Sequence, residues 1–397
     1  MKEIVRAIRS GHWPSLLAAW LHFGVSFMVW LLVGALGIMI SEDFGLTATQ
    51  MGLLVTVPLL SGALLRIPVG MCSDRFGPKP VGLALLAVEL VAVCWGWLGA
   101  TSYLHILGVG LGLGAAGASF AVAMPLASRA YPPAHRGLAM GVAASANGGV
   151  VVVAFFAPRL VETAGWHGVF GLMAVPILLT LPLFALLVRQ DIGWSAGGAS
   201  LRWGDETARL LKNPLTYWLC AAYAVTFGGF EGLASFLPIF FHYQYGVDTV
   251  MAGTLTAACG LAGSAIRPFG GHAADRLGGF AMLAVVFPVL VVLMIAVGFL
   301  PVLHWVTPLA VTAALAMGFG NGAVFQIVSD RYPKEVGTVS GLIGAAGALG
   351  GFVLPVSLGV LKDATGTYQS GFLVFAALAC AAWIGTLFFT RRRNRAS

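Results

Sequence analysis

Long apolar stretches, separated by short polar segments, run through almost the whole chain. A helix that crosses a bilayer needs about 20 mostly apolar residues, whereas a strand of a membrane barrel needs only about ten. Twelve stretches reach the helical length. We therefore predict an all-α membrane protein with transmembrane helices at residues 15–40, 49–72, 81–100, 104–129, 137–160, 167–188, 215–241, 250–274, 281–300, 306–329, 337–360 and 370–390.

One long polar segment interrupts this pattern near the middle of the chain, at residues 189–214. It leaves six predicted helices on each side. We therefore predict an N-terminal six-helix bundle at residues 1–188, a cytoplasmic linker at 189–214 and a C-terminal six-helix bundle at 215–397.

Charged residues are rare and unevenly placed. They make up 9% of the chain, against about 25% in a typical soluble protein. If both termini are cytoplasmic, all but four of the 22 lysines and arginines lie on the cytoplasmic side or at its helix ends. This bias follows the positive-inside rule, so the net charge of +7 indicates membrane topology rather than nucleic-acid binding. We expect a multi-pass protein of the cytoplasmic membrane.

The sequence gives no sign of a cofactor or a metal. Gly112-x-Gly114-x-x-Gly117 matches a dinucleotide fingerprint in form, but that fingerprint needs a preceding strand and a βαβ unit. The five cysteines show no C-x-x-C spacing, which disfavours a zinc site or a disulfide framework. The catalytic patterns H-E-x-x-H and G-x-S-x-G are also absent, so we expect no enzyme.

Two arginines stand alone in the middle of apolar helices, at matching places in the two halves. Arg66 and Arg267 are 201 residues apart. A guanidinium stays charged in a protein, and a charge at membrane depth costs from about 2.5 to well over 10 kcal/mol. Two such charges at equivalent positions of the two halves predict one central site for an anion. The alternative is that each arginine pairs with a nearby carboxylate.

The residues after each arginine form a second matched motif. Gly70-Met-Cys-Ser-Asp74-Arg75-Phe-Gly77-Pro-Lys79 resembles the signature loop of the major facilitator superfamily, and Gly271-His-Ala-Ala-Asp275-Arg276-Leu-Gly278 resembles its second-half copy. Tyr131-Pro132 also recurs as Tyr332-Pro333, so the repeat is parallel. The resemblance implies the major facilitator fold, with two bundles that rock about a midplane site. It also implies a latch that controls the conformational change, formed by Asp74, Arg75, Asp275 and Arg276.

Further residues resemble a narrower family, the nitrate/nitrite porters of the NarK and NasA type. The two arginines match that family's pattern, and so do an aromatic on helix 4 and a Tyr-x-x-x-Phe on helix 7. Glycine-rich segments on helices 5 and 11 match its signatures. The matching residues are Arg66, Arg267, Phe120, Tyr223, Phe227, Asn147 and the signature glycines Gly148, Gly149, Gly350 and Gly351.

This resemblance implies how an anion is held. The two arginines bind it, Phe120 and Phe227 flank its plane, and Tyr223 and Asn147 add hydrogen bonds. Nitrate is planar, and the planar fork of a guanidinium suits it. The second signature has Leu349 where the first has Asn147, so the amide contact comes from one half only.

Other polar residues of these helices have simpler explanations. Asn321 and Gln326, on the predicted tenth helix, are typical of residues that hydrogen-bond a neighbouring membrane helix.

Coupling to protons requires a group inside the membrane that can exchange one. Glu231 on helix 7 lies one turn beyond Phe227 and is the first candidate. Glu89 on helix 3 and His22 on helix 1 are the others. We therefore expect a monomeric, lipid-embedded symporter of nitrate or nitrite with protons. An exchanger of nitrate for nitrite, a carrier of a small carboxylate such as formate and a sensor with a carrier fold remain alternatives.

Overall fold

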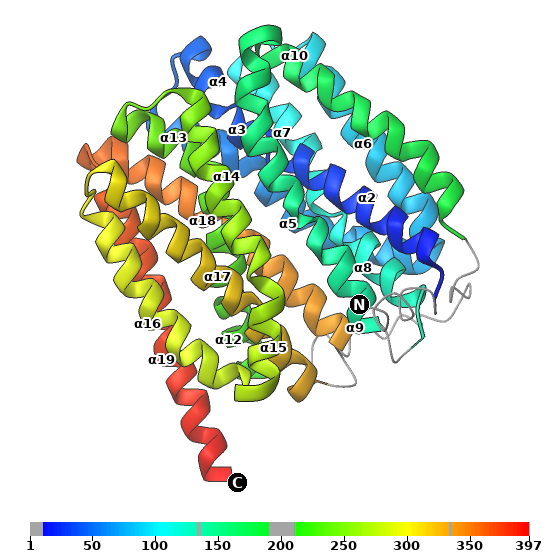
Figure 1. The fold of residues 1–397 in the computed structure, drawn as a ribbon, viewed down its shortest axis with the longest axis vertical. Helices are drawn as coiled ribbons and strands as arrows, with labels where there is room; N and C mark the ends of the chain where they lie inside the picture. Colours follow the sequence, from blue (N-terminus) through cyan, green and yellow to red (C-terminus); the bar gives the residue numbers. More distant parts are fainter. Residues whose placement is uncertain (1–10, 133–135, 190–209, 211, 333–335, 397) are drawn as a thin grey trace.

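The computed structural model describes residues 11–132, 136–189, 210, 212–332 and 336–396, and these residues contain helices and no strand (Figure 1). Ten of the described helices are long and apolar enough to cross a membrane. The predicted all-α membrane fold is therefore confirmed. The predicted linker lies mostly outside the described residues, and the proposed domain boundaries stay a prediction.

The first half of the chain forms the helices drawn from blue to green in Figure 1. They are α2 (Trp13–Trp30), α3 (Leu32–Ala35), α4 (Gly37–Phe44), α5 (Ala48–Phe76), α6 (Pro78–Leu98), α7 (Tyr103–Gly117), α8 (Phe120–Arg129), α9 (Arg136–Ser145), the short 3-10 turn η2 (Ala146–Gly148) and α10 (Gly149–Leu187).

The second half forms the helices drawn from green to red. They are α12 (Pro214–Tyr223), the π-helical segment η3 (Ala224–Gly228), α13 (Gly229–Tyr245), α14 (Thr249–Ala265), α15 (Arg267–Leu277), α16 (Gly279–Gly298), α17 (Leu303–Arg331), α18 (Val336–Thr365) and α19 (Gln369–Ala396).

Two local features explain why ten long helices correspond to twelve predicted spans. The first predicted span is divided into α2, α3 and α4 by breaks at Leu31 and Leu36. The fifth and sixth spans run together in α10, where Gly165 has φ 66° and ψ 165° and turns the chain between two helices. Glycine has no Cβ and adopts such a positive φ without strain, so this turn needs no separate loop.

Helix ends recur at one spacing in the two halves, which shows the parallel repeat in the backbone. Gly45 and Gly246 close α4 and α13 with φ 61° and 66°. Two residues later, the side chains of Thr47 and Asp248 accept hydrogen bonds from backbone N–H groups in the first turns of α5 and α14. These are standard caps for free backbone groups at helix termini. The members of each pair are 201 residues apart, as the two arginines are.

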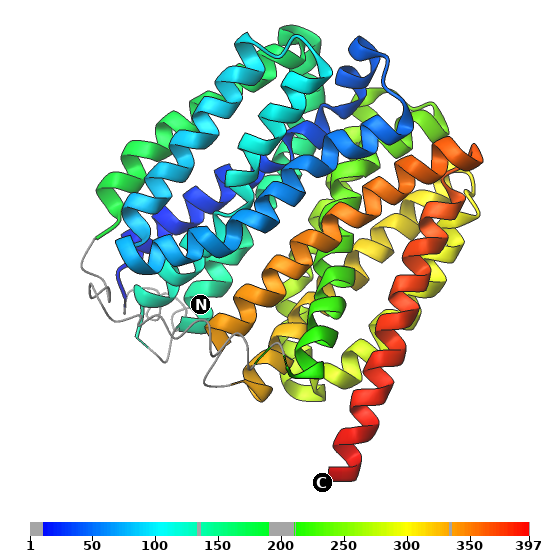
Figure 2. The same ribbon diagram turned by 180° about the vertical axis from the view of Figure 1, so that it is seen from behind.

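The buried apolar side chains form two clusters, one mainly from each half of the chain. The halves meet along α5 and α18, which lie side by side in Figure 2, and along α10 and α14. Small residues permit these crossings, as is usual between membrane helices. A Cβ added at Gly52 of α5 would lie 2.7 Å from the Pro355 carbonyl oxygen, and one added at Gly34 would lie 2.7 Å from that of Ser235.

The seventh predicted span, which comprises α12, η3 and α13 and is called helix 7 here, packs through glycine against the eleventh, α18, called helix 11. A Cβ at Gly228 would lie 2.5 Å from the carbonyl oxygen of Gly347 and 2.6 Å from the backbone of Gly350 and Gly351. The signature glycines of helix 11 therefore let α18 approach η3, the segment that carries Phe227.

We predict that Gly228→Ala lowers the unfolding temperature, because the added methyl group forces the two backbones apart. Overpacking of this kind costs about 1–3 kcal/mol, more than the helix propensity of alanine returns. Gly341→Ala is the matched control, since Gly341 is exposed on α18 and a Cβ there meets no atom within 4 Å. Thermal unfolding in detergent measures both variants, and an equal unfolding temperature for the two would contradict the proposed close contact.

Candidate functional site

Arg66 lies near the middle of α5 and is only 6% exposed. Its Nε donates a hydrogen bond to the Gly117 carbonyl at 3.0 Å, and Nη1 donates to the Gly344 carbonyl at 2.6 Å. Its remaining nitrogen, Nη2, is buried and has no hydrogen-bond partner. Among the residues that the structure describes, Arg66 forms no ion pair. The guanidinium is thus held in place by neutral dipoles, and no carboxylate of the described residues contacts it directly.

Three aromatic rings surround this guanidinium. Its central carbon lies 5.5 Å from the ring centre of Trp30, 5.6 Å from that of Phe120 and 5.4 Å from that of Phe227. Rings at this distance attract a cation through their quadrupole, and the attraction grows when water is excluded. Phe120 begins α8, directly after the break between α7 and α8, so the break that frees the Gly117 carbonyl also sets the position of this ring.

Arg267 approaches the same site from the second half, at the start of α15. Its side chain is 21% exposed, and Nη2 lies 3.4 Å from Oε1 of Glu231. Its central carbon lies 4.8 Å from the ring centre of Phe230 and 5.7 Å from that of Phe227. Phe227 is therefore shared by the two arginines. The Nε of Arg267 is buried and has no hydrogen-bond partner among the described residues.

Glu231 supplies the negative charge of the site. It is completely buried on α13, and its Oε2 has no hydrogen-bond partner within the described part of the chain. It interacts electrostatically with Arg267 and Arg66, and its carboxyl lies close to the amide of Asn147. The alternative that each arginine pairs with a nearby carboxylate is thus found for Arg267 and, among the described residues, not for Arg66.

Asn147 brings an amide from the first half to Arg267. It is buried in η2, and with its oxygen turned toward the guanidinium it accepts hydrogen bonds from Nη1 at 3.3 Å and Nη2 at 3.2 Å. Asn147 and Glu231 therefore hold Arg267 from opposite halves of the chain.

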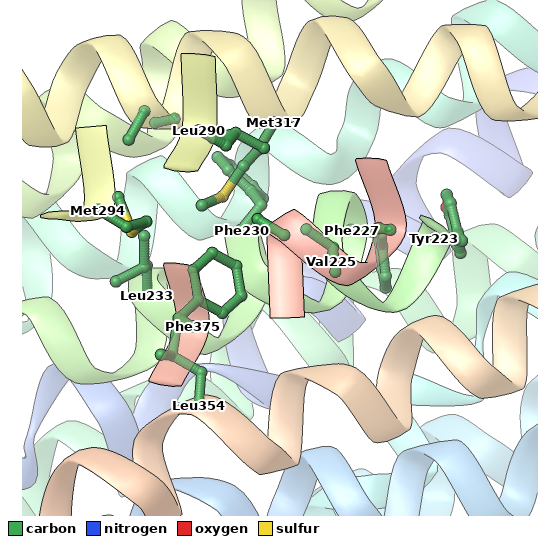
Figure 3. Close-up of a cluster of buried hydrophobic side chains, with 14 of the residues drawn as sticks. Tyr223, Val225, Phe227, Phe230, Leu233, Leu290, Met294, Met317, Leu354 and Phe375 are labelled. Atoms are coloured by element: carbon green, nitrogen blue, oxygen red, sulfur yellow. The ribbon is translucent and has the colours of Figure 1, made fainter. Parts of the chain in front are cut away.

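Tyr223 and Phe227 share one face of helix 7, as their spacing predicts. Their rings stack with centres 5.0 Å apart and planes 5° apart. Phe227 lies in η3, and π-helical turns of this kind occur often at functional sites. Figure 3 shows Tyr223 at the end of α12, Phe227 in η3 and Phe230 in α13 in order along the chain. The six predicted substrate-binding residues thus lie around one buried centre, although their contact with a substrate stays a prediction.

Glu89 and His22 lie elsewhere. Ser26 donates a hydrogen bond to Oε1 of Glu89 at 2.8 Å, and Nε2 of His22 donates to the Gly82 carbonyl at 3.2 Å. Both bonds join α2 to α6, so these two residues belong to a polar seam within the first half rather than to the arginine site.

The predicted latch residues lie at the end of α5 and α15. Asp74 forms an ion pair of 2.9 Å with Arg129 of α8, and Arg75 lies over the ring of Phe76. Arg276 is exposed, and the side chain of Asp275 lies outside the described part of the structure. A role in conformational change is untested for all four residues.

The signature glycines have separate surroundings. Gly149 packs against the backbone of Gly24 on α2, and Gly350 packs against Ala224 of η3. Gly351 lies within contact distance of Gly228, whereas a Cβ at Gly148 would meet no atom within 4 Å. Three of the four therefore stand at helix crossings.

Sequence reasoning missed the backbone ligands of Arg66, because the Gly117 and Gly344 carbonyls carry no side-chain signal. It also missed Trp30 and Phe230 as rings of the site. A partial signal was present for Gly117, since a cluster of glycines on one helix often marks a place where the backbone is approached closely.

Two arginines that approach one centre from the two halves of a membrane protein are typical of a membrane carrier with its site between two bundles. The comparison with protein families agrees, because the model of the Major Facilitator Superfamily matches residues 18–355. The same fold occurs in a bacterial homologue of the human lysosomal transporter Spinster, in an inward-facing and occupied conformation. That structure has a TM-score of 0.75 and 19% identity, covering 95% of this chain and 96% of its own.

Several relatives are more similar in sequence. A probable nitrate/nitrite transporter NarK2 of Mycobacterium tuberculosis is 34% identical, over 94% of this chain and 95% of its own length. A nitrite extrusion protein of Bacillus subtilis is 30% identical, over 90% and 89%. A probable nitrate/nitrite antiporter NarK1 of Thermus thermophilus is 29% identical, over 94% and 89%. The chain belongs to the major facilitator superfamily and, within it, to the nitrate/nitrite transporter family.

Proposed function

We propose that this protein is a secondary active transporter that moves nitrate, nitrite or both across the cytoplasmic membrane by alternating access. The observation that carries the proposal is the charge of Arg66, which no carboxylate of the described residues contacts directly. Two guanidiniums and one carboxylate, Glu231, surround the centre of the described structure, which leaves one positive charge in excess. A monovalent anion balances this charge, whereas a dianion leaves an excess of negative charge in a dry site.

The shape of the site supports a planar anion. Phe120 and Phe227 both lie beside the Arg66 guanidinium. A flat anion fits between two aromatic rings better than a tetrahedral anion does. Arg66 Nη2 and Arg267 Nε are donors without a partner, so each has an N–H available for an oxygen of the anion.

We infer further that the anion is transported without chemical change, by a monomer embedded in lipid with both termini in the cytoplasm. Entry of a monovalent anion into a cell that is negative inside costs about 2.3 kcal/mol per 100 mV. Uptake therefore needs a driving ion, and Glu231 beside the site is suited to carry a proton. The test is nitrate counterflow in proteoliposomes, with and without a proton gradient and with formate as the competitor. Absence of nitrate counterflow, or stronger competition by formate than by nitrite, contradicts the proposal.

The first prediction of this proposal concerns the arginines. Arg66→Lys and Arg267→Lys should each weaken nitrate binding about 100-fold or more, because loss of one partner of a buried charged contact costs about 3–5 kcal/mol. Lysine keeps the charge but lacks the planar fork. Calorimetric titration of the purified variants measures the affinity. Arg159→Lys is the control, since Arg159 bonds Thr254 away from the site. Wild-type affinity in both site variants would refute the role of the guanidiniums.

The second prediction concerns the shared ring. Phe227→Leu should weaken nitrate binding by about threefold to thirtyfold, the range of a cation–π contact in a dry site. It should also raise the relative uptake of the bulkier anion chlorate, because leucine shortens one wall of the slot that Phe120 and Phe227 are proposed to form around the anion. Competition assays in proteoliposomes measure the selectivity. Phe156→Leu is the control, since Phe156 is exposed on α10. The slot is wrong if both variants keep the selectivity of the wild type.

The third prediction separates the carboxylates. Glu231→Gln should keep nitrate counterflow but lose the acceleration produced by an inward proton gradient. The amide cannot release a proton, so the charge of the site no longer changes during the cycle. Glu89→Gln is the matched control, because Glu89 is equally buried but bonds Ser26. A normal gradient response in Glu231→Gln together with its loss in Glu89→Gln would assign coupling to the α2–α6 seam.

A further inference from the structure

One buried amide on helix 10 has no place in the hydrogen bonding of the fold. Asn321 of α17 is 5% exposed, and neither its Oδ1 nor its Nδ2 has a hydrogen-bond partner among the residues that the structure describes. Buried polar groups are nearly always hydrogen-bonded in native proteins, so such a group requires an explanation. Gln326 on the same helix shows the usual situation, since its Oε1 accepts a hydrogen bond from the Gly279 backbone at 2.9 Å.

The internal repeat places Asn321 beside the arginine site. It lies 201 residues after Phe120, as Arg267 lies after Arg66. The packing around these positions is also repeated. Gly62 lies against Gly117 in the first half, and Gly263 lies against Gly318 in the second; Gly70 lies against Ala121, and Gly271 lies against Gly322.

Asn321 therefore occupies, relative to Arg267, the position that Phe120 occupies relative to Arg66. Phe120 lies 5.6 Å from the Arg66 guanidinium.

The neighbours of Asn321 along α17 face the same segment of helix 7. One turn earlier, Met317 lies against Gly229, and one turn later, the ring of Phe325 lies 5.1 Å from that of Tyr223. Residues four apart share one face of a helix. Asn321 thus faces η3, between the two ends of the segment that carries Phe227.

We propose that Asn321 is a further ligand of the transported anion and that its Nδ2 donates a hydrogen bond to an anion oxygen on the Arg267 side. This inference rests on the proposed function. The amide is neutral, so it adds a donor without changing the balance of two guanidiniums and one carboxylate. The two repeat-related positions then differ in chemistry: Phe120 of α8 places a ring beside Arg66, and Asn321 of α17 places an amide on the Arg267 side.

The experiment compares the purified wild type with Asn321→Leu, Asn321→Asp and the control Gln326→Leu. Calorimetry gives the dissociation constant for nitrate, and thermal unfolding with and without nitrate gives the stability. Both Asn321 variants should bind nitrate about tenfold or more weakly, the effect of losing one hydrogen bond to a charged group.

The unfolding temperature without nitrate distinguishes a ligand from a structural residue. Asn321→Leu should leave it unchanged or raise it, because the amide bonds no protein group. Gln326→Leu should lower it and keep the nitrate affinity, because it loses the bond to Gly279.

If Asn321→Leu and Asn321→Asp both bind nitrate with the affinity of the wild type, this inference is wrong and the proposed function stands. A lowered unfolding temperature in both, as in Gln326→Leu, also overturns it. Absence of nitrate binding by the wild type overturns the proposed function and this inference with it.

Discussion

The charge of Arg66 is the constraint on which the centre of this molecule depends. A guanidinium cannot shed its proton, so at membrane depth it must be stabilised by dipoles, rings or an anion. Two backbone carbonyls and three aromatic rings provide the first two. The carbonyl of Gly117 is free because α7 ends there, and that of Gly344 comes from the other half of the chain. The helix break and the contact between the halves therefore both position groups that stabilise the Arg66 guanidinium.

The repeat supplies two copies of one scaffold, and the chemistry of the site lies in the differences between them. Each half places an arginine at the same position, but in the described part of the chain Arg267 has a carboxylate partner and Arg66 has none. Asn147 provides an amide where the second signature has Leu349, a side chain that is 40% exposed.

The sequence was sufficient for the helices and for the convergence of the arginines, because both depend on strong energetic terms. Apolar stretches of bilayer length leave few alternatives to a helix, and two buried charges in register leave few alternatives to a shared site. The breaks at Leu31 and Leu36 were not predictable, since neither position holds a proline or a glycine. The π-helical turn at Phe227 and the Gly344 carbonyl were also missed. These features arise from packing between distant helices, and no local pattern records them. Asn321 was visible in the sequence, but only its lack of a partner distinguishes it from Gln326.

The hydrogen bonds at the centre connect anion binding to the contact between the halves. Arg66 reaches from α5 to Gly344 of α18, and Arg267 reaches from α15 to Asn147 of η2. An anion that takes up N–H groups of either arginine competes with these bonds or strengthens their alignment. A proton on Glu231 has a related effect, because it frees Arg267 from its only carboxylate within the described residues. A ligand shifts a conformational equilibrium only through a difference in its interactions with the two states. In this protein the groups proposed to hold the anion also join the halves, so binding of the anion and contact between the halves involve the same N–H groups.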